Sequence, residues 1–419
     1  MPDKAKQRMR VLVVDEWLPY PLESGKKIRT FQLLAPLAQR HETTYLCYAD
    51  QQREAEKLTR MAEAGFNVIC VPPTNRFQTR LGLAAGVVGN LCSPTPLVIR
   101  KHFSRRFDKA VSELIQRETF DIIHCEWTHY AVFLRKVCRV PRFLCSHNVE
   151  CLPWRRFSEV QANPARRAAL YLEWRKMKLF ERRAISAFDH VSAVSETDAR
   201  IMQSWFSADS VEVIPNAVDT HFYEGQDGPK EDDLLVYCAS MDAWVNQDAA
   251  NYFVKRILPE IHKYRPQTRV MIVGREPPDA IRRLACDRVI VTGTVKDVRP
   301  LLAKATACIV PLRIAGGSRL KILEAFAAGL PVVSTSIGAE GLDVEPDRHL
   351  LIADKTTDFA SACLQLLTDR PLRERLGKAG KSLAREKYDW SAVYPLVENA
   401  WEQTIRNYYN KTRRANGNG

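Results

Sequence analysis

Short apolar runs rich in β-branched residues alternate with longer amphipathic stretches along the first half of the chain. The apolar runs predict strands buried on both faces of a sheet, at 11–14, 43–46, 68–71, 121–124, 143–145 and 191–194. The amphipathic stretches predict helices, at 25–39, 51–64, 105–118 and 165–187. Strands that alternate with helices are typical of a parallel, doubly wound α/β sheet.

The same alternation restarts after a polar, acidic segment at 224–233. A second series of strands is predicted at 234–239, 269–273, 289–292, 307–310, 331–334 and 350–353. We therefore expect two similar Rossmann-like domains, at 1–215 and 234–385, joined by a linker at 216–233. Ligands of such sheets lie at the carboxyl ends of the strands, so two such domains are expected to face a cleft.

Composition fits this interpretation, because 419 residues are too many for one ordinary domain and 46% are hydrophobic. The net charge of +13 is unevenly spread. Residues 1–200 hold 33 basic and 21 acidic side chains, whereas residues 201–419 hold 29 and 28. The first half is expected to meet an anionic partner or to carry a solvated basic face. Eleven cysteines without CxxC spacing favour a reducing compartment, and so a cytoplasmic protein.

The segment 309–333 carries the clearest chemistry. A strand ends at Pro311, Gly316 and Gly317 follow, and a helix is predicted from Ser318 to a cap at Gly329. Glycines before a helix let backbone N–H groups approach a phosphate, and the helix N-terminus adds about half a positive charge. Arg319 and Lys321 add two full charges, so the segment predicts a diphosphate site.

Glu324 lies about two turns into that helix. A carboxylate there is suited to accept hydrogen bonds from the two hydroxyls of a ribose. The alternative is an ordinary residue on the helix surface. Together with the glycines and the basic pair, Glu324 favours a nucleotide site.

The sequence resembles the group 1 (family four) glycosyltransferases of the GT-B fold over essentially its whole length. The resemblance is carried by this segment with its Glu-Ala-Phe-Ala-Ala-Gly-Leu-Pro-Val-Val ending, and by Ser146-His-Asn-Val-Glu150, Ala193-Val-Ser-Glu196 and Val213-Ile-Pro-Asn-Ala-Val-Asp219. It implies a nucleotide-sugar donor held by the second domain and an acceptor held by the first. It also implies a C-terminal helix, here 386–410, that packs back on the first domain, which leaves 411–419 as a flexible tail.

Two departures from the family pattern stand out. Glu324 matches the last Glu of the family's Glu-x7-Glu motif, but the position of the first carboxylate is Gly316. The sequence is similar to the branch with Gly-Gly-x-Arg-x-Lys at this place. The family's usual phosphate pair is replaced in the segment 239–248, so Arg319 and Lys321 are expected to stabilise the leaving diphosphate. Asn246 and Asp248 are candidates to line the donor site, or to cap the next helix.

Four residues of the first half are candidates for chemistry or acceptor binding. His147 follows the strand 143–145 and matches the family's active-site histidine, which implies contact with the donor sugar. Glu126 and His129 follow the strand 121–124 and are candidates to hold the acceptor. Each has a purely structural alternative. Gly25 matches a small-residue loop that closes over the substrates in the family.

Residues 154–183 concentrate the basic surplus, with aromatic side chains between the arginines and lysines. Such a surface suits an anionic membrane and lipid-linked sugars. Nucleic acid is not expected, because no nucleic-acid-binding motif accompanies it.

We therefore expect a cytoplasmic glycosyltransferase, peripheral on the inner face of the plasma membrane. It would transfer a hexose-type sugar from a nucleoside diphosphate sugar to a cell-envelope, exopolysaccharide or lipid-linked acceptor, with retention of configuration. No metal and no other cofactor is expected, because no DxD motif stands at a strand end. Two alternatives stay open: a sugar-nucleotide epimerase of the same fold, and a non-catalytic, membrane-bound partner subunit.

Overall fold

The structure is a computed structural model that describes residues 8–73, 93–135, 137, 139–209, 211–225, 228–314 and 320–416. The chain divides into two compact units. The first comprises Met1–Ile214 and Tyr394–Gly419, and the second comprises Pro215–Val393. Each unit is built on its own parallel sheet, so the predicted α/β fold with two Rossmann-like domains is confirmed.

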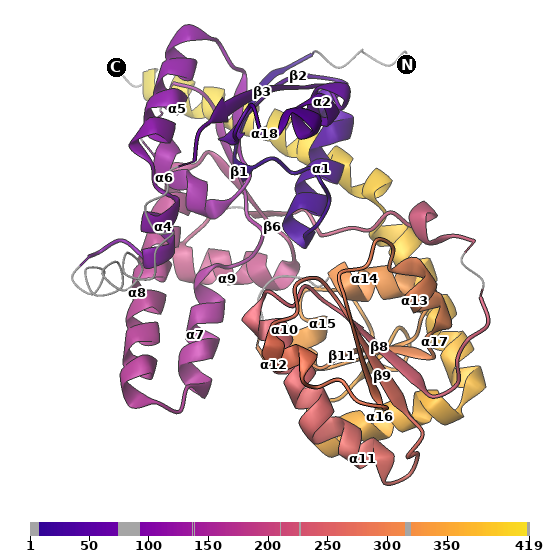
Figure 1. Ribbon diagram of the computed structural model, residues 1–419. Helices are drawn as coiled ribbons and strands as arrows, with labels where there is room; N and C mark the ends of the chain where they lie inside the picture. Colours follow the sequence, from indigo (N-terminus) through magenta and orange to yellow (C-terminus); the bar gives the residue numbers. More distant parts are fainter. Residues whose placement is uncertain are drawn as a thin grey trace. The chain divides into compact units, whose positions relative to one another are not determined.

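Seven parallel strands form the sheet of the first unit (Figure 1), in the order β3-β2-β1-β4-β5-β6-β7. They are β1 (Arg10–Trp17), β2 (Glu42–Tyr48), β3 (Phe66–Val71), β4 (Ile122–Cys125), β5 (Arg142–Cys145), β6 (His190–Ala193) and β7 (Val211–Val213). The central strand β4 is buried along its whole length, as expected where helices cover both faces of a sheet. The short edge strand β7 was not predicted, because three half-buried residues carry little periodic signal.

Helices of the first unit connect these strands. They are α1 (Gly25–Ala38), α2 (Ala55–Glu63), α4 (Leu97–His102), α5 (Arg105–Arg117), α6 (Ala131–Leu134), α7 (Cys151–Val160), α8 (Pro164–Ala187) and α9 (Glu196–Phe206), with a 3-10 turn at Thr128–Tyr130. The basic segment 154–183 is therefore not one helix: α7 and α8 lie side by side as a hairpin (Figure 1). Asn163 accepts a hydrogen bond from the backbone N–H of Arg166 and so begins α8.

Six parallel strands form the sheet of the second unit, in the order β10-β9-β8-β11-β12-β13. They are β8 (Leu234–Cys238), β9 (Arg269–Val273), β10 (Val289–Gly293), β11 (Ala307–Val310), β12 (Val332–Ser334) and β13 (Leu351–Ile352). The helices are α10 (Trp244–Tyr252), continued by a π-helical turn at Phe253–Ile257, α11 (Leu258–His262), α12 (Asp279–Arg282), α13 (Arg299–Lys304), α14 (Leu320–Ala327), α15 (Ser336–Ala339), α16 (Thr356–Thr368) and α17 (Arg370–Lys387), with a 3-10 turn at His221–Tyr223.

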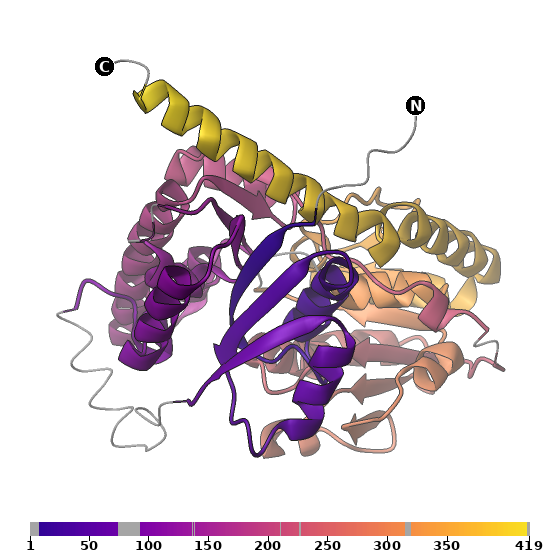
Figure 2. The same ribbon diagram turned by 90° about the horizontal axis from the view of Figure 1, so that it is seen from above.

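The last helix, α18 (Trp390–Asn416), begins in the second unit and belongs to the first from Tyr394 onward. Figure 2 shows it running beside the strands of the first unit. Trp401 is fully buried there, and the Glu398 carboxylate lies 3.0 Å from Nε2 of the buried His41. The flexible tail expected at 411–419 stays a prediction: residues 411–416 continue helix α18, and 417–419 lie outside the described residues.

Two further expectations bear on the surroundings of the protein. Most described cysteines are buried free thiols, but Cys286 is exposed. In the described ranges, none of the helices combines the length and the apolar composition that crossing a membrane requires.

Candidate functional site

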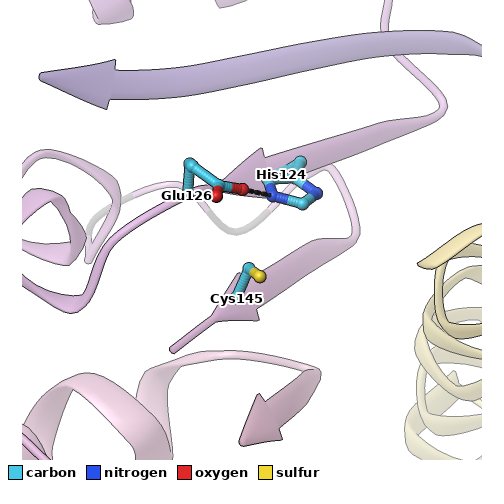
Figure 3. Close-up of side chains that lie close together, drawn as sticks. All are labelled: His124, Glu126 and Cys145. Atoms are coloured by element: carbon cyan, nitrogen blue, oxygen red, sulfur yellow. Dashed lines mark hydrogen bonds and ion pairs between the residues drawn. The ribbon is translucent and has the colours of Figure 1, made fainter. Parts of the chain in front are cut away.

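Glu126 is the centre of a buried polar cluster at the carboxyl ends of β4 and β5 in the first unit. Its Oε1 accepts hydrogen bonds from Thr30 Oγ1 and from His147 Nε2, each over 2.8 Å. Its Oε2 lies 2.5 Å from Nε2 of His124 (Figure 3). The structure thus brings two of the predicted residues, Glu126 and His147, into direct contact.

The protonation of this cluster follows from its contacts. Burial opposes the charged form of Glu126, but hydrogen bonds from His124 and His147 hold the pKa of that carboxyl well below its usual range. Burial lowers the pKa of His147, although Glu126 opposes this. Glu126 is therefore a carboxylate, and His147 is a neutral ring that donates through Nε2.

His129 lies on the 3-10 turn after β4 and is not one of the residues that donate to Glu126. Burial, helped by the charge of His102, holds the pKa of His129 well below its usual range. Its Nε2 is 3.9 Å from the carboxylate of Glu150, which also accepts from the indole of Trp127 over 2.6 Å. Burial raises the pKa of Glu150 to about 7. A carboxyl that titrates near neutrality is suited to proton exchange. Glu150 was not predicted as a site residue and appeared above only as the last residue of the Ser146–Glu150 motif.

Lys26, near the start of α1, was not predicted as a site residue. Its Nζ lies 2.8 Å from Oδ1 of Asp15 and 3.3 Å from Oε2 of Glu16, both at the end of β1. The ammonium also stands 4.3 Å from the ring centroid of Trp127. Burial works to lower the pKa of Lys26, but the two carboxylates raise it, so the lysine stays charged.

Gly25 is the first residue of α1, directly after Ser24, whose Oγ accepts a hydrogen bond from the backbone N–H of Lys27 over 3.4 Å. This places Gly25 one residue before Lys26, at the same end of the sheet. Arg29 of the same helix is buried and donates to the carbonyl of Ile214 over 2.8 Å, so its guanidinium supports the local chain.

In the second unit, Lys321 of α14 is held at the carboxyl end of β8. Its Nζ donates to Oδ1 of Asn246 over 2.9 Å and to the hydroxyl of Tyr237 over 3.4 Å. Asn246 donates in turn to the carbonyl of Ser240 over 2.7 Å. The structure therefore brings Lys321 and Asn246 together, with Asn246 orienting the lysine.

Two arginines that the sequence analysis missed surround the same segment, 239–248. Arg275, two residues after β9, donates to Oγ of Ser240 over 2.7 Å and to Asp242 over 3.0 Å. Arg313, three residues after β11, forms a bidentate ion pair with Asp248: its Nε donates to Oδ2 over 3.1 Å and a terminal guanidinium nitrogen donates to Oδ1 over 2.5 Å. Their positions directly after parallel strands are the sequence signal that would have found them. Asp248 is thus a partner of Arg313.

Glu324 lies one turn beyond Lys321 on α14. Burial raises the pKa of Glu324, and the charge of Lys321 opposes the rise. Among the described residues, no side chain donates a hydrogen bond to its carboxylate. The carboxylate therefore has its acceptor capacity available for a ligand.

Four predicted donor residues lie outside the described residues: Gly316, Gly317, Ser318 and Arg319. The roles expected for them stay predictions. The description of α14 begins at Leu320, directly after them.

Both units match models of known protein families. Residues 28–222 match the model described as Glycosyltransferase Family 4, and residues 232–369 match the model described as Glycosyl transferases group 1. The two matches together cover most of the chain.

Two curated relatives illustrate the range of the matches. The MMP α-(1→4)-mannosyltransferase of Mycolicibacterium hassiacum is 25% identical over 270 residues, which is 60% of this chain and 64% of that protein. The phosphatidyl-myo-inositol mannosyltransferase of Mycobacterium leprae is 30% identical over 152 residues, 35% of this chain and 40% of that protein. The chain thus spans less than two thirds of the length of either relative.

Solved structures match over nearly the whole chain. Anabaena HepE in complex with UDP and glucose superposes with a TM-score of 0.64 and 16% identity, covering 94% of this chain and 100% of that one. Sucrose-phosphate synthase from Thermosynechococcus elongatus gives 0.70 and 16%, covering 95% and 100%. At this identity the likeness concerns the fold, and it confirms the GT-B architecture.

Proposed function

The chain belongs to the group 1 glycosyltransferases of the GT-B fold, and on that basis we propose that it transfers a sugar from a nucleoside diphosphate sugar to an acceptor hydroxyl. The acceptor class is a cell-envelope, exopolysaccharide or lipid-linked precursor. Transfer proceeds with retention of anomeric configuration and without a metal ion.

One observation carries the donor side of this proposal. Lys321, Arg275 and Arg313 reach the segment 239–248 from three different elements of the second unit, at the carboxyl edge of its sheet. Cations anchored in this way stabilise a diphosphate as negative charge develops on it, without reorganising at the moment of reaction. Glu324, one turn beyond Lys321, serves the ribose hydroxyls.

In the first unit, the neutral ring of His147 and the Glu126 carboxylate that holds it stand at the carboxyl ends of β4 and β5. The chemistry is one of positioning and charge, because the leaving diphosphate itself can take the acceptor proton as the new bond forms on the same face. His147 then orients a sugar hydroxyl close to the reacting carbon.

A donor screen tests this function. UDP, GDP and ADP are titrated calorimetrically first, and the corresponding hexose and N-acetylhexosamine donors are then followed for hydrolysis and for transfer to lipid-linked acceptors. We expect one base to bind, and its sugar donor to be turned over without added metal and in excess EDTA. Absence of binding by all three diphosphates would exclude the proposal. HepE, which superposes on this chain, is solved with UDP, so UDP is the first ligand to try.

The epimerase alternative needs carboxylates that exchange protons with the sugar. In the described part of the first unit, Glu126 accepts from three donors, and Asp15 and Glu16 are held by Lys26, which favours transfer. Glu150, whose pKa is raised by burial to about 7, is the carboxyl to replace if the product is an epimer. Product analysis separates the two outcomes, since an epimerase returns an epimer of the nucleotide sugar, whereas a transferase joins the sugar to the acceptor and releases the nucleoside diphosphate.

The hairpin of α7 and α8 is the surface we propose for contact with an anionic membrane. The basic residues of 154–183 were predicted to form one surface, but the structure divides them. Lys176 is buried against Glu173, and Arg167 donates to the carbonyls of Ser158 and Glu159, which ties α8 to α7. Lys176 is therefore removed from the proposed surface, whereas Arg167 stays exposed but is held against α7.

We centre the proposed surface on one stripe along α8 with helical spacing, formed by exposed apolar and arginine side chains: Tyr171, Leu172, Arg175, Leu179, Arg182 and Arg183. A shallow hollow of about 410 Å³ lies on it, lined by Leu179, Arg182, Arg183, Ser186 and Ala187. Glu181 of the same helix is buried, so it does not offset the positive stripe. Apolar side chains flanked by arginines suit the headgroup region of an anionic bilayer, and the Mycobacterium leprae relative is named for a phosphoinositide lipid.

A further inference from the structure

We propose that Trp401 and His124 are positioning residues that act through Glu126 to fix His147 in a single tautomer, with its Nδ1 lone pair presented to a substrate hydroxyl. The inference rests on the proposed role of His147 in sugar transfer. It assigns a function to the C-terminal helix α18 and to a buried histidine for which the sequence suggested none.

The first step is set by the indole of Trp401. An indole N–H can only donate, and here it donates to Nδ1 of His124 over 2.9 Å. Glu126 favours a second proton on the His124 ring, but the indole occupies the lone pair that would receive it. Burial lowers the pKa of His124, but its contacts with Cys145 and Glu126 raise it to about 9. The indole N–H opposes that second proton and favours the ring with one proton, on Nε2.

The second step passes through Glu126. The His124 Nε2–H group donates to Oε2 of the carboxylate over 2.5 Å, and Thr30 and His147 donate to Oε1. Burial opposes the charged form of Glu126, but its hydrogen bonds with His124 and His147 hold its pKa well below the usual range. As a carboxylate, Glu126 accepts all three hydrogen bonds, so the chain of donors runs from Trp401 through His124 to Glu126.

The third step concerns the ring of His147. Since its Nε2–H group points at Glu126, a neutral His147 carries its lone pair on Nδ1. Among the described residues, Nδ1 has no hydrogen-bond partner. His147 remains partly accessible, with 11% of its side chain exposed, whereas the side chains of His124 and Glu126 have no exposed surface. A hydrogen bond from a sugar hydroxyl to Nδ1 is the contact that this arrangement prepares.

A metal site is the competing explanation of the same cluster. Ligand atoms of His124, Glu126 and Cys145 all lie within 4.8 Å of one another (Figure 3). A metal-bound histidine ordinarily donates from its other ring nitrogen. Here that nitrogen accepts from Trp401, so a metal on Nε2 would require the ring to lose both protons. The guanidinium of Arg29, 4.0 Å from Cys145 Sγ, further disfavours a cation. The donor set fits a relay better than a metal.

Histidine tautomers in the full chain provide the decisive measurement. The protein is labelled with 15N-histidine, and the two ring nitrogens of His124 and His147 are assigned with single His→Asn variants. We expect both rings in the Nε2–H tautomer in the wild type. In Trp401→Phe, which keeps an aromatic ring but lacks the N–H, His124 should populate a second tautomer or protonation state. The ring signals of His147 should then change, because the Glu126 carboxylate that holds its Nε2–H group loses its fixed donor from His124.

The kinetic counterpart uses the donor that the screen identifies. Trp401→Phe should lower kcat by about 10-fold with an unchanged KM for the donor, as expected for a positioning defect. Trp390→Phe, at another buried tryptophan of α18, should change neither kcat nor the spectra. Glu126→Gln, of the same size, is the second variant should Trp401→Phe prove unstable, and it should also release His147 from its single tautomer.

Two results would overturn the inference. One is an unchanged His147 spectrum and kcat in a folded Trp401→Phe protein. The other is stoichiometric Zn²⁺ binding by the wild type that is lost in Cys145→Ser. The tautomer measurement needs no substrate, so a failed donor screen would refute the transfer function while leaving the relay separately testable.

Discussion

Lys321 donates a hydrogen bond to Oδ1 of Asn246 over 2.9 Å. This contact joins the lysine that we expect to bind a phosphate to the segment 239–248, which also binds Arg275 and Arg313. Replacing Lys321 with Gln should weaken binding of the nucleoside diphosphate by about 10- to 100-fold, because a charge-assisted hydrogen bond is lost. Asn246→Ala should give a smaller effect of the same sign, since the lysine is kept but released. Calorimetry with UDP and GDP measures both.

Two comparisons make the Lys321 result specific. The free nucleoside should bind both variants as it binds the wild type, since it has no phosphate. Lys378→Gln, at an exposed position of α17, should leave all affinities unchanged. A parallel loss of nucleoside affinity in Lys321→Gln would contradict the phosphate assignment.

Glu324→Gln should remove discrimination between a ribonucleotide and its 2′,3′-dideoxy analogue. The wild-type carboxylate is expected to accept from both ribose hydroxyls, so the wild type should prefer the ribonucleotide by about 10-fold or more. Competition binding with the two nucleotides gives this ratio directly. Equal preference by the wild type itself would sink the ribose assignment, whatever the variant does.

The stripe along α8 predicts salt-sensitive membrane binding. Replacing Arg175, Arg182 and Arg183 with Gln should reduce binding to phosphatidylglycerol vesicles by roughly 100-fold or more, at about 1 kcal/mol per arginine. Vesicle co-sedimentation measures it, with uncharged phosphatidylcholine vesicles as the reference lipid.

A charge-matched control comes from the second unit, where Arg348, Arg370 and Arg385 are exposed. Changing these three to Gln lowers the net charge equally and should leave vesicle binding almost intact. If both triple variants lose binding alike, attraction is a property of net charge and the hairpin has no special role. Donor hydrolysis should survive in both.

Stability at acidic pH should depend on Asp389. Although burial works to raise its pKa, hydrogen bonds from Ser391 and Thr220 lower it to about 2, below the ordinary value of about 4. A lowered folded-state pKa stabilises the protein above pH 4, and this contribution is lost as the pH falls towards 2. Asp389→Asn should therefore lower the free energy of unfolding by about 1 kcal/mol at pH 7, after allowance for solvent screening.

The difference between wild type and Asp389→Asn should shrink between pH 4 and pH 2 and vanish below it. Thermal unfolding followed by circular dichroism over that range measures this. Asp287→Asn, at an exposed aspartate of the same unit, should run parallel to the wild type throughout. A constant offset for Asp389→Asn down to pH 2 would show that its carboxylate charge contributes nothing.

The alternation of apolar runs and amphipathic stretches predicted both sheets, because strands buried on both faces are continuous runs of apolar, mostly β-branched residues. It could not assign the faces of α8. Lys176 and Glu181 stand in a basic, polar run, yet both are buried. Lys176 pairs with Glu173, and Glu181 accepts hydrogen bonds from the backbone N–H groups of Glu150 and Cys151 at the start of α7. Only knowledge of the packing partner reveals such a role.

Ion pairs between distant segments were equally beyond the sequence. Arg313 and Asp248 are 65 residues apart, and Arg275 and Asp242 are 33 apart. Motifs pointed to His147 and Lys321, and the end of a predicted strand pointed to Glu126, but neither signal shows which partners orient these residues. The hydrogen bond from Trp401 to His124 joins residues that are 277 positions apart, the largest separation of these contacts.

Residues 394–416 belong to the first unit but follow the whole second unit in the sequence. During synthesis, the first unit therefore cannot complete its fold until the second unit has been translated. Until then, the sites that receive Trp401 and Glu398 face solvent. A nascent chain arrested before Trp401 should therefore expose its first half to chaperones, and assembly of the His147 relay becomes one of the last events in the biogenesis of the protein.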